Sequence, residues 1–161
     1  MPTAIRPVRA AVACFTRTRL FRRHGPRMMP PLERAASRLT HGRRGPLSGA
    51  IVPSLTLYTL GARTGEPRTT ALMCCPLPDG VILVTGSNFG RPEHPAWTWN
   101  LLAHPDVVVV HRGERLPVHA ELVPDAEREE TWRLLEENWP GYRGYERASG
   151  RELRIFRLTP R

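Results

Sequence analysis

Apolar and polar residues alternate in short runs from Ser54 to the end of the chain. Leu55 and Leu57 alternate with Thr56 and Tyr58. This period of two indicates a strand with one buried face. Similar runs follow, separated by turns that contain glycine or proline. The pattern predicts six strands and one four-residue hairpin loop at 112–115, the strands covering residues 54–60, 68–75, 81–85, 106–111, 116–123 and 152–158.

Segments with helical character interrupt these strands. Pro95 suits the start of a helix that reaches about His104, because the first turn of a helix leaves its N–H groups unbonded and proline lacks that group. A short turn or helix is expected over residues 141–148. Short strands with few helices indicate a mainly β protein with helices (α+β), built as a small and mostly antiparallel barrel.

Another helix is expected between Asp125, as its N-cap, and Pro140, which stops it. Glu129 lies four residues before Arg133, the favourable order for an ion pair along one helix face. The sequence therefore predicts a helix with one aromatic face, made by Trp132, Leu135 and Trp139.

The charge of the chain is concentrated at its beginning. Residues 1–47 hold 11 arginines and one acid, a net charge of +10, whereas residues 48–161 hold 13 arginines and 14 acids, a net charge of −1. We expect two units: a basic, partly helical N-terminal extension over residues 1–50, and a barrel domain over residues 51–161.

The N-terminal extension carries a weak amphipathic pattern. Val8, Val12 and Phe15 repeat at helical spacing among the arginines. Such a segment can pack on the barrel as a partly ordered helix, lie on an anionic membrane surface, or contact nucleic acid. The nearly neutral charge of the remaining chain argues against nucleic acid, because a dedicated nucleic-acid-binding fold carries positive charge on its folded surface.

The apolar runs and the cysteines exclude two further classes of protein. No apolar run approaches the roughly 20 residues that a membrane-spanning helix needs. Cys14, Cys74 and Cys75 form no disulfide framework, and no spacing typical of a metal site occurs. Cys74 and Cys75 are expected to be small buried residues that point to opposite faces of one strand. We expect no metal, and a location in the reducing cytoplasm or at the inner face of the cell membrane.

Two loops carry candidate chemistry. The first, from Gly61 to Arg68, joins two expected strands and offers two guanidiniums, a hydroxyl and the N–H groups of a turn. These groups can bind a phosphate or a carboxylate, although an Arg-rich hairpin tip is also a common solvated turn. The second loop leads from Gly86 into the next helix, where Trp97 and Trp99 would provide a flat apolar wall. Trp97 fits a core position at least as well.

Four short motifs follow one another in the chain: G-x-[RK]-[ST]-G-x-P-R at residues 61–68, S-N-x-G at 87–90, H-P-A-W-x-x-N-L at 94–101 and P-x-Y-x-x-Y at 140–145. In this order they resemble the deazaflavin-dependent nitroreductase family, which includes F420H2-dependent quinone reductases. Its members use coenzyme F420, an 8-hydroxy-5-deazaflavin. The resemblance covers about residues 54–160 and implies a split β-barrel like that of the FMN-binding oxidoreductases.

The resemblance also implies which residues bind the cofactor. The positions that hold its anionic tail correspond to Ala62, Arg63, Thr64 and Arg68, and Ala62 replaces a basic residue of many relatives. The strand that follows corresponds to Thr69, Thr70, Ala71, Leu72 and Met73. The positions around the deazaflavin ring correspond to Thr85, Gly86, Ser87, Asn88, Ala96, Trp97, Thr98, Trp99, Asn100 and Tyr142.

The function implied by the resemblance is an F420H2-dependent oxidoreductase that transfers a hydride to a hydrophobic acceptor such as a quinone, an enone or a nitro compound. An acceptor that takes up a hydride becomes an anion, and Tyr142, Tyr145 and Ser87 offer hydroxyls to stabilise or protonate it. Trp139 replaces a tyrosine that is common in quinone-reducing members, which leaves the acceptor open. The alternative is a non-catalytic barrel that carries F420, a lipid or another flat ligand.

Overall fold

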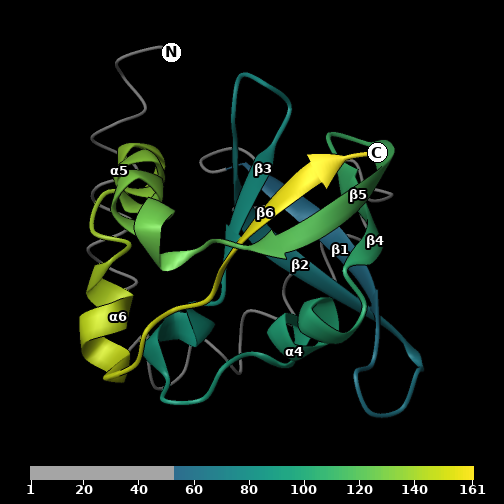
Figure 1. The fold of residues 1–161 in the computed structure, drawn as a ribbon, viewed down its shortest axis with the longest axis horizontal. Coiled ribbons are helices and arrows are strands. Elements are labelled where there is room, and N and C mark those ends of the chain that lie inside the picture. Colours follow the sequence, from purple (N-terminus) through teal and green to yellow (C-terminus); the bar gives the residue numbers. More distant parts are fainter. Residues whose placement is uncertain (1–52) are drawn as a thin grey trace, which may run out of the picture.

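A computed structural model describes residues 53–161 of the chain (Figure 1). Its strands are β1 (Ser54–Leu60), β2 (Pro67–Pro76), β3 (Ile82–Thr85), β4 (Asp106–His111), β5 (Glu114–Leu122) and β6 (Ile155–Pro160). Its helices are α4 (Ala96–Ala103), α5 (Arg128–Asn138) and α6 (Gly144–Ser149), with the 3-10 turns η1 (Asn88–Gly90) and η2 (Asp125–Glu127). The six predicted strands are confirmed. The basic extension, with its pattern at Val8, Val12 and Phe15, lies outside the described residues.

The strands form a closed antiparallel barrel in the order β1-β2-β3-β6-β5-β4. β1 completes the closure, because Tyr58 lies opposite Thr69 of β2 on one side and opposite Val108 of β4 on the other. Every strand therefore has two hydrogen-bonded neighbours, and the barrel has no exposed edge strand. The predicted mainly β fold with helices is confirmed.

Helix α4 lies across one end of the barrel (Figure 1). Its Trp97 and Leu101 side chains are buried, and the Trp97 ring centre lies 5.8 Å from that of Phe156 in β6. They belong to the barrel core, which also contains Leu57, Val84, Val109, Val118 and Leu158. As predicted, the helix begins directly after Pro95. The apolar contacts of α4 thus fix the loop that leads into it.

A second apolar cluster lies outside the barrel wall, against α5 and α6, which are drawn on the left of Figure 1. Leu83 of β3 belongs to this cluster, whereas its neighbours Ile82 and Val84 belong to the barrel core. Cys75 and Cys74 divide between the two clusters in the same way, which confirms that they point to opposite faces. The aromatic face predicted for α5 is confirmed for Trp132 and Leu135, and Trp139 packs in the same cluster from its extended position directly after the helix.

The predicted N-cap of α5 is wrong. Asp125 lies in a 3-10 turn that follows Pro124, and α5 begins only at Arg128, with no side-chain cap. Arg128 instead contacts α6 and the segment that follows it. Its guanidinium donates to the Glu146 carboxylate of α6 at 2.6 Å and to the Leu153 carbonyl beyond the helix at 2.9 Å. These tertiary bonds stabilise the start of the helix in place of a local cap.

The predicted ion pair within α5 is also wrong. Arg133 pairs with Glu130 and lies 3.8 Å from Glu137. Glu129 pairs with Arg143, beyond the end of the helix, at 2.5 Å. The fold brings the Arg143 guanidinium close to Glu129, which pairs with it instead of with Arg133, the partner expected from helical spacing.

The β4–β5 hairpin has a shorter loop than the four residues predicted at 112–115. Arg112 and Gly113 alone form the turn, with φ angles of 54° and 88°. Two successive positive φ angles are typical of a type I′ turn, whose twist matches that of the flanking strands. β5 therefore begins at Glu114.

The last strand begins later than predicted, at Ile155 rather than at residue 152. The Leu153 N–H donates to a glutamate carboxylate of α6 at 2.9 Å. The Arg154 carbonyl accepts from the Gly86 N–H at 2.8 Å. These residues therefore connect α6 and the second motif loop instead of extending the strand.

Candidate active site

The first motif loop is a tight turn whose side chains are open to solvent. The Gly61 N–H donates to the Glu66 carbonyl at 2.8 Å, which closes the turn. The Arg68 guanidinium pairs with the Glu66 carboxylate at 2.7 Å, and about half of its side chain is exposed. Arg63 and Thr64 are also exposed. The loop thus presents two guanidiniums and one hydroxyl to solvent.

A single buried amide fixes this loop to α4. The Asn100 side chain accepts from the N–H of Ala62, itself exposed, at 2.9 Å and donates to the Thr59 hydroxyl at 3.0 Å. Asn100 therefore joins the end of β1 to the helix that follows the second motif loop. The two motif loops meet at α4, although 38 residues separate Ala62 from Asn100.

The second motif loop has a strained backbone. Asn88 and Phe89 have φ angles of 46° and 55°, values that cost free energy for residues other than glycine. Gly90 has a φ of 74°, and a Cβ atom there would lie 3.3 Å from the Tyr145 ring. The Asn88 amide donates to the Glu93 carbonyl at 2.9 Å. Neighbouring segments hold this loop in one conformation, as is common for strained backbone at functional sites.

The Arg151 side chain stabilises the second motif loop through several hydrogen bonds. Its guanidinium donates to the carbonyls of Arg91 at 3.1 Å, Gly86 at 3.0 Å and Ser87 at 3.3 Å. It also lies 3.0 Å from His94 Nδ1, and burial together with nearby arginines lowers the pKa of His94, so the neutral ring accepts this bond. Sequence reasoning missed Arg151, because no local spacing connects it with partners some 60 residues earlier.

The side chains at the start of α4 divide between the protein interior and the solvent. Trp97 and Thr98 are buried, and the Thr98 hydroxyl donates to a backbone carbonyl three residues earlier at 2.8 Å. Trp99 is 51% exposed, and the Arg154 guanidinium lies 3.7 Å from its ring centre, a cation–π contact. Ala96 is exposed. Of these residues, Ala96 and Trp99 face solvent, whereas Trp97 is a core residue.

Strand β2 places its five candidate residues in different surroundings. Thr69 and Ala71 are exposed, and Thr70 is half-buried. Leu72 packs against the barrel core, whereas Met73 packs against the second cluster. The exposed members form a strip that continues from the first motif loop.

The predicted catalytic residues lie together at the end of β3. The buried Tyr142 phenol donates to the Thr85 carbonyl at 3.5 Å, and the side chains of Ser87 and Thr85 both lie near its oxygen. The Tyr142 ring contacts Trp132 and Tyr145 edge-on, with centres 6.3 and 5.8 Å apart. Burial raises the pKa of Tyr142 to about 12, and its hydrogen bonds only partly oppose this effect. The phenol is therefore protonated at neutral pH.

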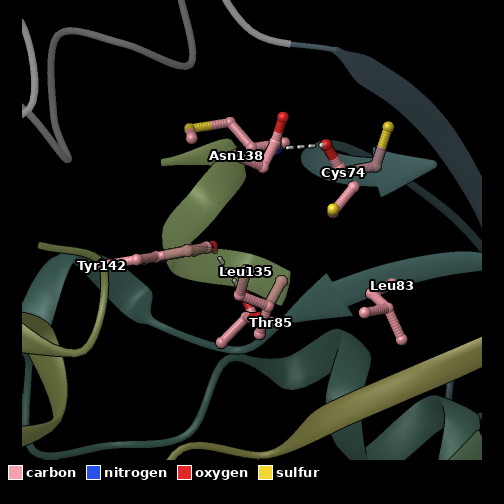
Figure 2. Close-up of a pocket in the computed structure, with 8 residues that line it drawn as sticks. Cys74, Leu83, Thr85, Leu135, Asn138 and Tyr142 are labelled. Carbon is pink, nitrogen blue, oxygen red and sulfur yellow. Dashed lines mark hydrogen bonds between the residues drawn. The ribbon is translucent and has the colours of Figure 1, made fainter. Parts of the chain in front are cut away.

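A pocket opens beside Tyr142, between the barrel wall and α5 (Figure 2). Its enclosed part has room for about one water molecule, and the 190 Å³ of empty space around it includes open solvent. Burial raises the pKa of the Cys74 thiol to about 12, so it too stays protonated. The Asn138 amide donates to the Cys74 carbonyl at 3.2 Å. The lining residues are Met73, Cys74, Cys75, Leu83, Thr85, Leu135, Asn138 and Tyr142.

Sequence reasoning gave no site role to five of these lining residues, Cys74, Cys75, Leu83, Leu135 and Asn138. Leu83 and Leu135 carry the apolar periodicity of a strand and a helix, which is the pattern of ordinary core residues. Only the packing of α5 on the barrel wall brings them to one pocket.

Comparison with known proteins identifies the family. The sequence model of the F420H(2)-dependent quinone reductases matches residues 32–160. The chain belongs to this family. The resemblance inferred from the four motifs is confirmed, and the predicted cofactor and enzyme class are those of the family.

Individual relatives agree with this result. An F420H(2)-dependent quinone reductase of Mycobacterium tuberculosis is 34% identical over 147 residues, which are 89% of this chain and 98% of the relative. A solved F420-H2 dependent reductase, FDR-A, is 32% identical with a TM-score of 0.59, over 66% of this chain and 93% of its own. A solved domain-swapped dimer is 28% identical with a TM-score of 0.60, over 81% of this chain and 98% of its own. The predicted split-barrel fold is confirmed.

The donors of this quinone reductase family member fit a cofactor with a flat ring and an anionic tail. Arg63 and Arg68 provide positive charge on a solvent-facing turn, with the Thr64 hydroxyl between them. The exposed Ala96 and Trp99 at the start of α4 offer surface for a flat ring. Among residues 53–161, no three His, Cys, Asp or Glu side chains gather where they could hold a metal ion.

Proposed function

We propose that this family member reduces quinones at the pocket beside Tyr142, with F420H2 as the hydride donor. The observation that carries the proposal is a buried and protonated phenol at the edge of an apolar pocket. The enclosed space would take one oxygen atom of a flat, uncharged acceptor, and the ring would lie against the apolar mouth, where burial of its surface is favourable. The name of the family supports a quinone as that acceptor.

In this proposal the first motif loop binds the anionic tail of F420. Arg63, Arg68 and the Thr64 hydroxyl would donate to phosphate and carboxylate oxygens, with the Ala62 backbone held in place by Asn100. The exposed Thr69 and Ala71 of β2, the residues of the second motif loop, Ala96 and Trp99 remain candidates for contact with the rest of the cofactor. Trp97 and Thr98 are left out, because Trp97 packs on Phe156 in the barrel core and the Thr98 hydroxyl donates to a backbone carbonyl.

The chemistry of the acceptor assigns a role to Tyr142. The hydride comes from bound F420H2, and a quinone that receives it becomes a hydroquinone anion. The phenol of Tyr142 would give that anion a proton and recover it from solvent, while Ser87 holds the phenol in place. Tyr145 packs edge-on against Tyr142 and would keep its ring in position.

Turnover tests this function directly. The full chain is mixed with F420H2 and menadione, and oxidation of the cofactor is followed by its absorbance. We expect catalytic oxidation that depends on both the chain and menadione. Binding of F420 without turnover would instead support the carrier of a flat ligand, and a preference for FMN over F420 in a fluorescence titration would contradict the proposal.

The raised pKa of Tyr142 predicts the alkaline pH profile. Because the folded chain keeps the phenol protonated up to about 12, we expect kcat/KM for menadione to show no loss with an apparent pKa near 10. The unfolded chain releases this proton near 10, so Tyr142 lowers the stability of the fold as the pH rises from 10 toward 12. Initial rates and thermal melts across this range measure both effects, and a fall in rate centred near 10 would contradict the proposed donor.

We also propose that the basic extension brings this cytoplasmic enzyme to anionic membranes, where hydrophobic quinones are found. The support is the charge of +10 in residues 1–47, worth about 1 kcal/mol for each arginine that reaches the surface. No helix in the described part of the chain is long and apolar enough to cross a membrane.

Vesicle binding tests this peripheral contact. We compare the full chain with a chain that lacks residues 1–31, which retains the segment matched by the family model. The full chain should co-sediment with vesicles that contain phosphatidylserine and be released by salt, whereas the shortened chain, which lacks seven of the eleven arginines in residues 1–47, should bind much less. Equal sedimentation of the two chains would contradict the proposal, and salt-sensitive binding to duplex DNA alone would favour nucleic acid.

A further inference from the structure

Thr85 is an exception among the buried threonines of residues 53–161. The hydroxyls of Thr98 and Thr131 each donate to a backbone carbonyl at 2.8 Å, and that of Thr59 accepts from Asn100 at 3.0 Å. The Thr85 hydroxyl makes no such hydrogen bond in this part of the chain, although the Tyr142 phenol lies near it and its residue is only 6% exposed. A buried hydroxyl without a partner costs stability, so it calls for an explanation.

The backbone around Thr85 fixes where this hydroxyl lies. Thr85 ends β3 and is paired with Ile155 of β6. Its carbonyl accepts from the Ser87 N–H at 2.9 Å and from the Tyr142 phenol at 3.5 Å. A β-branched side chain also has few rotamers. The Thr85 hydroxyl therefore lies beside the Tyr142 phenol at the pocket.

The surroundings indicate what kind of group the hydroxyl would bind. Thr85 and Tyr142 both line the pocket against α5, and Leu83 and Leu135 line it with them (Figure 2). No charged side chain belongs to the lining. A neutral, flat molecule with an oxygen atom at its edge matches an apolar pocket that ends in two hydroxyl donors.

We propose that the Thr85 hydroxyl is a second donor to the reacting oxygen of the acceptor, beside the Tyr142 phenol. The inference rests on the proposed quinone reduction and adds a residue that selects acceptors by their carbonyl oxygen. The quinone gains a hydride from F420H2 and a proton from Tyr142, which takes a new proton from solvent. Thr85 keeps its own proton, and its hydrogen bond strengthens as the acceptor oxygen becomes negative.

The test replaces Thr85 by valine, which has the same shape without the hydroxyl, and by serine, which restores it. We expect T85V to lower kcat/KM for menadione about tenfold to a hundredfold, and T85S to recover most of the loss. The affinity of T85V for F420 should stay unchanged. Menadione binding to the cofactor-free chain, followed by tryptophan fluorescence, should weaken about tenfold in T85V.

Thermal stability separates this role from a structural one. Because the Thr85 hydroxyl has no partner in the described chain, T85V should melt at the same temperature as the parent or higher. The matched control is T131V, since the Thr131 hydroxyl donates to the Glu127 carbonyl in α5. T131V should melt at a lower temperature and keep the parental kcat/KM.

Each contrary result has a distinct meaning. If the parent turns over menadione and T85V equals it, Thr85 does not contact the acceptor and the inference is wrong. A T85V protein that loses F420 affinity instead places the hydroxyl on the cofactor and also overturns it. A parallel loss of melting temperature and activity marks Thr85 as structural. If the parent itself does not oxidise F420H2 with menadione, the proposed function fails first and the inference falls with it.

Discussion

Replacing Arg63 and Arg68 together by alanine is expected to weaken F420 binding about a hundredfold or more. Hydrogen bonds to charged groups contribute about 1.5–3 kcal/mol each, and both guanidiniums lie on the exposed turn that we assign to the anionic tail. Arg68 already has an exposed partner in Glu66, so its single replacement should have the smaller effect. A fluorescence titration with F420 measures the loss.

A matched control separates the loss of a site from the loss of positive charge. Arg133 is also exposed and also pairs with a nearby glutamate, but it lies on α5 away from the turn. Arg133→Ala should keep the parental affinity for F420. The double variant, the single Arg68→Ala variant and Arg133→Ala should all melt close to the parent. Unchanged affinity in a folded double variant would show that the tail binds elsewhere.

Replacing Tyr142 by phenylalanine is expected to slow quinone reduction about tenfold to a thousandfold. Phenylalanine keeps the edge-on contacts with Trp132 and Tyr145, so the fold and the affinity for F420 should be retained. Only the phenol that donates a proton is removed. Steady-state rates with menadione, together with a melting curve, measure the two effects separately.

The control for this variant is Tyr58→Phe, since Tyr58 lies on the outer side of β1 beneath the Arg115 guanidinium. It should reduce menadione at the parental rate. A Tyr142→Phe rate equal to that of the parent would mean that Tyr142 only packs. Tyr145, Ser87 or water would then have to supply the proton.

The strands were predictable because each one carries its own pattern. Leu55 and Leu57 of β1 are buried as their alternation with polar residues requires. Trp132 and Leu135 were predictable for the same reason, since helical spacing alone places them on one face. Turn chemistry is harder to read, and the two-residue turn at Arg112 was missed because arginine seldom adopts a positive φ.

The candidate site was only partly predictable. The motif residues were found through a family resemblance, and the structure brings Thr85, Ser87 and Tyr142 together. The contacts that hold these residues could not be predicted, because they join segments far apart in the chain. Arg151 reaches the second motif loop across about 60 residues, and Glu129 leaves its helical neighbour for Arg143.

The Asn100 amide has a consequence for how quickly a ligand is captured. Its bonds to Ala62 and Thr59 hold the first motif loop without help from an anion. A polyanionic tail would therefore meet a turn whose backbone is already formed, and little backbone entropy would be lost when it binds. Association would then be limited by diffusion and by the attraction between opposite charges rather than by closure of a loop.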